Sequence, residues 1–374
     1  MKTVLHCADL HISSSDEKTK QYCLGVLDEI IEHTKSQKAD FLIFAGDIFN
    51  SYKDVTNMKG DFRSRIKTLP DSCEVIFVTG NHEYLYSGMK NPKISGIDLG
   101  ISSGNVVEYT KERPLMLFKY EGIEFLAIPH NSEYSSYINW ELPEKENYRL
   151  CIAHAQVSGF NFEGINEDVE EETTLLDPDV FDKVKADYVA MGHIHSSTKH
   201  KLSNNCELSY PGSARVWRSG EKGERKLEIL TIDDKAHKIM SITLLPIKSA
   251  GQYRHYELPL DLDGGCIELD NISKAWGSND YIDIRFEGIV DDENMVAELE
   301  SSIISKFNKK VRELHINREN VFAVDGISSH VIAKKFIDIW ERDKPAEDEE
   351  DISAWLKARQ IGLTHIKRAI EALQ

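Results

Sequence analysis

The chain has 374 residues, enough for two domains, and its 41% hydrophobic and 29% charged residues are typical of a folded globular protein. Its formal net charge of −18 argues against a polyanionic partner held by a broad basic surface, although it leaves room for binding in a local groove. The cysteines are widely spaced without a CxxC pair, no apolar stretch has membrane-spanning length, and the start leaves no room for a signal peptide. These features predict a cytoplasmic protein with free thiols.

The first half of the chain alternates strand-like runs with helical stretches. Residues Lys18 to Lys35 carry apolar side chains at helical spacing and lie between two runs that we expect to be strands. Strand, helix and strand in this order predict a parallel pair with a crossover. Further strands are expected at Glu124 to Pro129 and at Arg149 to Ala153, and two antiparallel strands between Lys226 and Leu245.

Five of the strand-like runs end in residues that commonly bind metals. In chain order, these endings are Asp9-Leu10-His11, Gly46-Asp47, Gly80-Asn81-His82-Glu83, Ala153-His154 and Gly192-His193-Ile194-His195. In an open α/β sheet, ligands bind at the edge where the strands have their C-terminal ends. Any one of these endings could be a turn with a capping aspartate or a satisfied histidine, but five in this order are hard to produce by packing alone. A decayed site kept as a scaffold is the remaining alternative.

Seven side chains in these endings are candidate ligands, three of the oxygen or amide type and four imidazoles: Asp9, Asp47, Asn81, His11, His154, His193 and His195. This number suits two divalent ions better than one. Mixed oxygen and nitrogen ligands, with no cysteine in any motif, favour Mn²⁺, Fe²⁺, Zn²⁺ or Mg²⁺. Two such ions, about 3.5–4 Å apart, clamp the attacking and leaving oxygens of an in-line phosphoryl displacement.

Two residues have more specific candidate roles. Asp47 is the candidate for the carboxylate that bridges the ions, because Asp9 lies beside His11 and is expected to serve one ion with it. His82 directly follows Asn81 and is the candidate general acid for the leaving oxygen. The alternative for His82 is a histidine that only hydrogen-bonds another group of the site.

A composition shift around Pro246 to Gln252 marks a domain boundary. Beyond it, Tyr281 to Gly288 alternates like a half-buried strand, and a helix and another strand follow, which predicts a small α+β unit the size of a cap. The last fifty residues are helical in pattern. One apolar stripe runs from Ile332 to Trp340, and a second, interrupted near Gly362, runs from Ile352 to Leu373. These helices either fold back on their own domain or lie in a partner's groove, and spacing leaves both open.

The order DxH, GD, GNH(D/E), H and GHxH resembles the calcineurin-like metallophosphoesterase superfamily. Within it, Gly46-Asp47-Ile48-Phe49, Tyr210-Pro211-Gly212-Ser213 and the order of the domains look like the SbcD/Mre-eleven DNA nucleases. The resemblance implies an α/β fold, with a four-layer α/β/β/α sandwich over residues 1–245 and a small α+β capping domain over 246–324. C-terminal helices over 325–374 would dock on a coiled-coil ABC ATPase of the SbcC type.

The resemblance also implies residue roles and an activity. One ion would be held by Asp9, His11, Asp47 and His195, and the other by Asp47, Asn81, His154 and His193. His82 would handle the leaving group. The implied enzyme cleaves DNA with two Mn²⁺, or Mg²⁺, as an exonuclease on double-stranded ends and an endonuclease on single strands and hairpins, in DNA repair and recombination.

Family members of this kind form homodimers, and the resemblance places the dimer contacts of this chain in helices around Asn57 to Leu69 and Ser87 to Gly100. It implies no association with a membrane. Two positions depart from the family pattern. Glu83 stands where an aspartate is usual, which should be tolerated. Asn50 stands where some members carry a histidine thought to assist the exonuclease step, so the balance of the two nuclease activities stays open.

Two other classes of function compete with the nuclease. A calcineurin-like phosphodiesterase or phosphatase acting on a small-molecule or protein phosphoester would share the same site. Such domains generally end soon after the last ligand motif, whereas this chain continues through residues 246–374, roughly a third of its length. A non-catalytic scaffold would be marked by lost ligands, and none of the seven is missing.

Overall fold

The structure is a computed structural model that describes residues 1–83, 104–107, 116–128, 130, 142, 144–160, 175–261, 264–290, 292–323, 330–345 and 349–371. The chain divides into two compact units, Met1–Gly251 and Gln252–Gln374, and each is considered by itself. The expected boundary at residue 246 lies close to this division. The helix expected around Ser87 to Gly100 lies outside the described residues.

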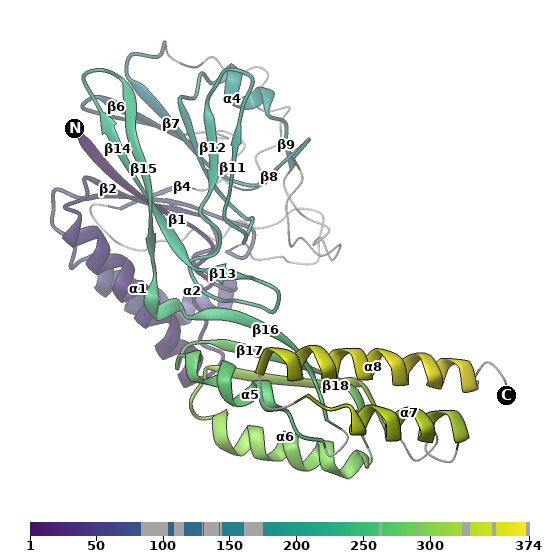
Figure 1. The fold of residues 1–374 in the computed structure, drawn as a ribbon. Coiled ribbons are helices and arrows are strands. Elements are labelled where there is room, and N and C mark those ends of the chain that lie inside the picture. The colour runs from purple at the N-terminus through teal and green to yellow at the C-terminus, as the bar shows by residue number, and fades with distance from the viewer. Residues whose placement is uncertain are drawn as a thin grey trace, which may run out of the picture. The chain divides into compact units, whose positions relative to one another are not determined.

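The first sheet of the first unit has the strand order β15-β14-β1-β2-β3-β4 (Figure 1). Its strands β1 to β4 are parallel, and the β14–β15 hairpin joins β1 in antiparallel pairing. The bounds are β1 (Lys2–Cys7), β2 (Phe41–Ala45), β3 (Glu74–Val78), β4 (Gly104–Val107), β14 (Lys226–Asp233) and β15 (Lys238–Pro246).

Two helices connect the first three strands. They are α1 (Glu17–Ser36), close to the expected Lys18 to Lys35, and α2 (Tyr52–Ile66). Each begins at a side chain that caps its first turn, Asp16 for α1 and Ser51 for α2. Both helices bury one face against the first sheet, which fixes that side of the unit.

The second sheet has the order β11-β12-β10-β7-β6-β5. Its bounds are β5 (Met116–Tyr120), β6 (Ile123–Ile128), β7 (Tyr148–His154), β10 (Tyr188–Gly192), β11 (Thr198–Lys201) and β12 (Glu207–Tyr210). Its four inner strands are parallel, as continuous apolar runs such as Leu150 to Ile152 predict. Shorter elements complete the unit: β8 (Gln156–Val157), β9 (Leu175–Leu176), α4 (Asp179–Lys183) and β13 (Gly223–Glu224).

Three buried clusters separate the layers. One lies between the first sheet and α1 and α2, and a second lies between the two sheets, where Ile43 and Ile76 meet Phe125 and Ile152. The third packs the outer face of the second sheet against α4, around Phe181. This is the predicted four-layer α/β/β/α sandwich, and the prediction is confirmed.

The second unit is built on three parallel strands, β16 (Gln252–Pro259), β17 (Tyr281–Val290) and β18 (Glu313–Ala323). The helices α5 (Ile267–Ile272) and α6 (Glu293–Phe307) pack on one face of this sheet. Alternate residues of β17, including Ile282, Ile284 and Phe286, point into that cluster. The unit is therefore a small α+β fold, as expected.

The terminal helices α7 (Val331–Arg342) and α8 (Glu349–Glu371) belong to this second unit. Ala333 of α7 and Leu363 of α8 bury against Ile289 of β17. The second apolar stripe is interrupted near Gly362, but α8 runs through this position: a Cβ on Gly362 would lie 2.3 Å from Phe336 Cζ, so the glycine admits α7. None of the described helices is long and apolar enough to cross a bilayer.

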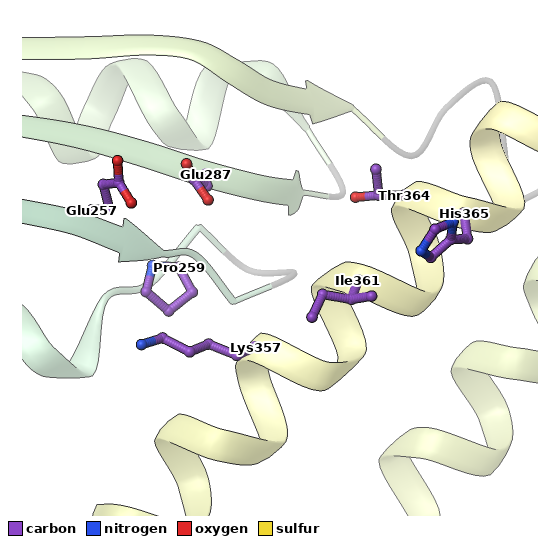
Figure 2. A pocket seen from close by; sticks show the side chains of 7 residues that line it. All are labelled: Glu257, Pro259, Glu287, Lys357, Ile361, Thr364 and His365. Atoms are coloured by element: carbon purple, nitrogen blue, oxygen red, sulfur yellow. The ribbon is translucent and has the colours of Figure 1, made fainter.

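Trp340 and Trp355 face each other between α7 and α8. The rings of Trp340 and Trp355 lie 6.0 Å apart. Where α8 passes the ends of β16 and β17, a cavity of about 420 Å³ remains, as Figure 2 shows. It is lined by Glu257, Pro259, Glu287, Lys357, Ile361, Thr364 and His365.

A buried polar network joins the two sheets of the first unit. Glu228 on β14 accepts hydrogen bonds from His6 Nδ1 (3.1 Å) on β1, Tyr188 Oη (2.9 Å) on β10 and Ser209 Oγ (2.6 Å) on β12. Burial by itself raises the pKa of Glu228, but the hydrogen bonds from His6 and Ser209 and the charge of Lys199 lower it to about 2. The network therefore keeps a carboxylate ionised between the sheets.

We expect Glu228→Gln to destabilise the chain by about 3 kcal/mol at pH 7, because lowering the pKa from 4.5 to about 2 favours folding by roughly that amount. This stabilisation is complete above about pH 4.5 and is lost as the pH falls towards 2, so the gap between variant and wild type should narrow in that window. Urea unfolding across the range measures it, with Glu121→Gln at an exposed turn as control. An unchanged gap between pH 7 and pH 3 would contradict the role given to Glu228.

Candidate metal centre

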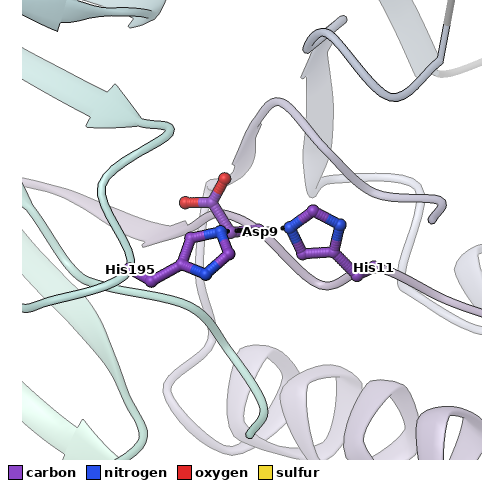
Figure 3. A group of neighbouring side chains, drawn as sticks. All are labelled: Asp9, His11 and His195. Carbon is purple, nitrogen blue, oxygen red and sulfur yellow. Dashed lines mark hydrogen bonds between the residues drawn. The ribbon is translucent and has the colours of Figure 1, made fainter. Parts of the chain in front are cut away.

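The predicted ligands lie at the C-terminal ends of five strands or in the loops that follow them: β1, β2 and β3 of the first sheet and β7 and β10 of the second. The structure brings donor atoms of six of them, with His82, into three overlapping groups in which all atoms lie within 4.8 Å of one another. The groups are Asp9, His11 and His195; His11, Asp47 and His82; and Asp47, His154 and His193. Figure 3 shows the first of them. The seventh residue, Asn81, joins through its Oδ1, 3.1 Å from His154 Nε2.

The carboxylate of Asp47 lies at the middle of these groups. Its Oδ2 is 3.3 Å from His154 Nε2, 3.8 Å from His11 Nε2 and 3.9 Å from His82 Nε2. Its Oδ1 accepts a hydrogen bond from the backbone N–H of His82 at 3.0 Å. One oxygen therefore faces three imidazole nitrogens while the other anchors the loop after β3.

Hydrogen bonds at the far side of three rings decide which nitrogen faces the centre. His154 Nδ1 donates to the carbonyl of Ala45 (2.8 Å), and His82 Nδ1 donates to that of Asn50 (2.9 Å). His195 Nδ1 donates to Glu221 Oε1 at 2.5 Å. Because each Nδ1 donates a proton to its acceptor, Nε2 is the nitrogen that faces the centre and that would bind an ion once it is unprotonated, which is how metal-binding histidines are usually oriented.

The electrostatics of the centre call for positive charge. Burial by itself lowers the pKa of His154, but the carboxylates of Asp47 and Asp9 raise it to about 9. Burial also raises the pKa of Asp9 to about 6, although His154 and His195 oppose this. Two carboxylates among imidazole lone pairs are stable only with a further proton or a cation between them. The donor set fits divalent ions that accept both oxygen and imidazole ligands.

Four of the seven predicted ligands have a positive backbone φ angle, which residues other than glycine rarely adopt. They are Asp9 (φ 52°), His11 (φ 43°), Asp47 (φ 47°) and His193 (φ 96°). Such conformations cost of order 1–3 kcal/mol each and persist only where the surroundings enforce them. Here the loops after β1 and β2 enforce them together, because the amides of Asp9 and His11 donate to the carbonyls of Gly46 and Asp47.

The glycines of the motifs are required by packing around the ligands. A Cβ on Gly80 would lie 2.1 Å from Asp47 Oδ1. A Cβ on Gly192 would lie 1.8 Å from the carbonyl oxygen of Ala45 and 2.9 Å from His154 Nδ1. The motifs therefore contain glycine because there is no room for a side chain between neighbouring loops of the first sheet at Gly80, or between the two sheets at Gly192.

Sequence reasoning missed a segment after β12 that contains no predicted ligand. Arg215 donates from Nε to the carbonyl of Leu10 (2.7 Å) and from Nη2 to that of His11 (2.5 Å), while Glu221 holds His195. Trp217 lies flat against His11. The segment has no regular periodicity, so the only signal near it was Tyr210-Pro211-Gly212-Ser213.

Glu83, the residue that departs from the family pattern, also holds the loops of the centre in place. Its two oxygens accept from the amides of Phe49 (2.9 Å) and Gly80 (2.7 Å), so it ties the loop after β2 to the loop after β3. Burial raises the pKa of Glu83 to about 7, with the nearby Asp47 adding to the effect.

We expect Gly192→Ala to destabilise the chain by about 3 kcal/mol, because its methyl group would overlap the Ala45 carbonyl and displace His154. Urea unfolding measures the loss, and calorimetric titration with Mn²⁺ should show weaker binding. Gly25→Ala, in α1 with no atom within 4 Å of the added methyl, is the matched control and should stabilise by about 0.5–1 kcal/mol. Equal stability of the two variants would show that the sheets have more freedom than the structure allows.

Comparison with known proteins places this centre in a family. The profile of the calcineurin-like phosphoesterases matches residues 2–197, more than half of the 374 residues. The chain is 24% identical over 226 residues to exonuclease subunit 1 of Enterobacteria phage T4, covering 59% of this chain and 62% of that protein. It is 23% identical over 228 residues to the DNA double-strand break repair protein Mre11 of Methanopyrus kandleri, covering 56% and 48%. The chain thus spans about half to three fifths of the length of these curated relatives.

Among solved structures, the purple acid phosphatase PPD1 from yellow lupin seeds matches 67% of this chain and 52% of its own, at 14% identity and a TM-score of 0.43. The match to the family profile confirms, at the level of the family, the prediction of a metal-dependent phosphoesterase. The chain belongs to the calcineurin-like phosphoesterase family.

Proposed function

We propose that the chain is a DNA nuclease that cleaves phosphodiester bonds with two divalent ions, Mn²⁺ by preference. The observation that carries the proposal is the convergence of carboxylate, amide and imidazole donors around Asp47. The printed names of the two relatives, an exonuclease subunit and a double-strand break repair protein, support DNA as the substrate. The proposed activities are exonuclease action on double-stranded ends and endonuclease action on single strands and hairpins, in DNA repair and recombination.

We assign the ligands as the resemblance implies. Asp9, His11, Asp47 and His195 would hold one ion, and Asp47, Asn81, His154 and His193 the other. The position of Asp47 Oδ2 among His11, His82 and His154 supports its role as the bridge. Bound in this way, two ions would neutralise charge on the phosphoryl oxygens and activate the attacking water.

His82 has a separate role in the proposal. Its Nδ1 is occupied by the carbonyl of Asn50, so only Nε2 can address the substrate, and Nε2 already faces the centre. A protonated Nε2 can donate to the leaving oxygen as the phosphoester bond breaks. His82 is therefore assigned as the general acid and not as a ligand.

The experiment is a cleavage assay on labelled blunt, hairpin and single-stranded DNA with Mn²⁺. We expect cleavage that EDTA abolishes, and a His82→Asn variant whose turnover falls by about 10²–10⁴-fold, since a positioned acid typically contributes that much. Calorimetry should show that His82→Asn still binds two Mn²⁺.

Asp47→Asn is the comparison variant for this assay, because the proposed bridge should affect both ions, whereas Asp9→Asn should chiefly weaken one. Hydrolysis of a chromogenic phosphodiester without any DNA cleavage would favour the alternative, a phosphodiesterase of small-molecule or protein phosphoesters. Wild-type turnover in His82→Asn would contradict the general-acid role of His82 and would indicate that the metal ions alone stabilise the leaving oxygen.

We propose domain roles on the same basis: residues 1–245 form the nuclease domain, 246–324 cap bound DNA, and 325–374 dock a coiled-coil ABC ATPase of the SbcC type. An outer face of α7 supports the docking role. Val331, Ile332 and Ile339 lie on one side of this helix and are 69%, 61% and 50% exposed, while Ala333 faces the unit's own core. Amphipathic helices commonly use such a face in a partner's groove.

We expect Ile332→Glu/Ile339→Glu to abolish co-purification with the co-expressed ATPase, because two buried charges would disrupt an apolar interface. The circular dichroism of the chain should not change, since both side chains are exposed. Lys334→Glu, also exposed on α7, is the control and should keep the partner. Retention of the ATPase by the double variant would rule out this face of α7.

The chain is also proposed to form a homodimer, through the region around Asn57 to Leu69 that overlaps α2. This rests on the resemblance, and the second segment it names, Ser87 to Gly100, lies outside the described residues. A monomeric mass in light scattering would contradict it.

A further inference from the structure

One tryptophan outside the predicted ligand set lies against three histidines of the metal centre. The indole of Trp217 stacks on His11 with ring centroids 4.1 Å apart and planes inclined by 5°. His82 meets the indole edge-on, at 5.3 Å and 87°, and His195 does so at 5.2 Å and 70°. The indole is half-buried, so it forms a wall of the centre and not part of an apolar core.

Hydrogen bonds connect the same tryptophan to two of these histidines. Its Nε1 donates to Asn50 Oδ1 at 2.6 Å, and the backbone carbonyl of Asn50 accepts from His82 Nδ1 at 2.9 Å. Its backbone N–H donates to Glu221 Oε2 at 2.8 Å, and Glu221 Oε1 accepts from His195 Nδ1. Trp217 is thus connected to His82 through Asn50 and to His195 through Glu221.

We propose that Trp217 is a positioning residue of the centre, whose ring fixes the plane of His11 and whose indole N–H fixes Asn50 and through it His82. The inference rests on the proposed function, in which His11 binds an ion and His82 addresses the leaving oxygen. It adds a residue that coordinates nothing and touches no reacting atom.

The physical reason is the freedom of an imidazole ring. The χ2 torsion of histidine has a broad, roughly twofold preference, so packing must select the orientation in which a nitrogen faces the ion. A parallel indole restricts rotation of His11 out of its plane, and stacked aromatic pairs add about 0.5–1.5 kcal/mol beyond burial. Tryptophan alone combines a ring of this area with an N–H that reaches Asn50, since phenylalanine has no donor.

The experiment compares Trp217→Ala and Trp217→Phe with wild type in the full chain. Mn²⁺ affinity is measured by calorimetry, and turnover is measured at saturating Mn²⁺ on diphenyl phosphate, whose phenolate leaving group benefits from a donated proton. Loss of the stack in Trp217→Ala should lower the affinity for one of the two ions by about tenfold or more. Trp217→Phe should keep Mn²⁺ affinity close to wild type, while kcat falls by about tenfold with KM unchanged, because only the link to Asn50 is lost.

A double-mutant cycle separates positioning from general structure. In a His82→Ala background, Trp217→Phe should lower kcat no further, because both changes act through one group. Trp276→Phe is the matched control: Trp276 packs on Phe307 in the second unit, and its replacement should change neither measurement. Circular dichroism reports folding, and if Trp217→Ala does not fold, Trp217→Phe and the cycle decide the question.

Two results overturn the proposal: wild-type affinity for both ions in Trp217→Ala, or an equal loss of kcat by Trp217→Phe with and without His82. The proposed nuclease function fails separately. Absence of DNA cleavage, with the expected pattern intact on diphenyl phosphate, would contradict the nuclease and leave the role of Trp217 supported.

Discussion

The carboxylate of Asp47, buried among three imidazole nitrogens, is the interaction on which the rest of the first unit depends. A buried charge is costly unless it is paired, and imidazole lone pairs that point inward cannot pair with a carboxylate. The raised pKa of His154 expresses the same demand for positive charge. Divalent ions would supply this positive charge, so the electrostatics of the buried side chains favour metal binding at this centre.

Holding such a cluster requires a rigid frame, because four of the predicted ligands have unfavourable backbone conformations. The frame consists of two sheets with parallel inner strands, in which neighbouring loops leave no room for a side chain at Gly80 and the approach of the two sheets leaves none at Gly192. Glu83 ties two of the ligand loops together, and Arg215 holds a third by its carbonyls. The strain at the ligands is thus offset by hydrogen bonds from residues that bind nothing themselves.

Much of this was accessible from sequence because its signals are local. Continuous apolar runs predicted the parallel strands, and α1 was expected within one residue of its observed ends. The sequence left open what a distant contact decides. Spacing allowed the terminal helices either to fold back on their own domain or to lie in a partner's groove, and only the structure shows that Ala333 and Leu363 bury against Ile289. Gly362, where the second stripe is interrupted, admits Phe336 of α7.

The sequence by itself determined which side chains can bind a metal and that they follow strands, because residue type and periodicity are written along the chain. It also determined the family, through the order of these motifs. Only the tertiary structure decided how the centre is held. Trp217, Arg215 and Glu221 are far in sequence from His11 and belong to a segment without periodicity, and their contacts exist because β12 runs beside β10 and returns the chain to the loop after β1. A stacking ring or a carbonyl hydrogen bond leaves no pattern in sequence, since its partner is chosen by the fold.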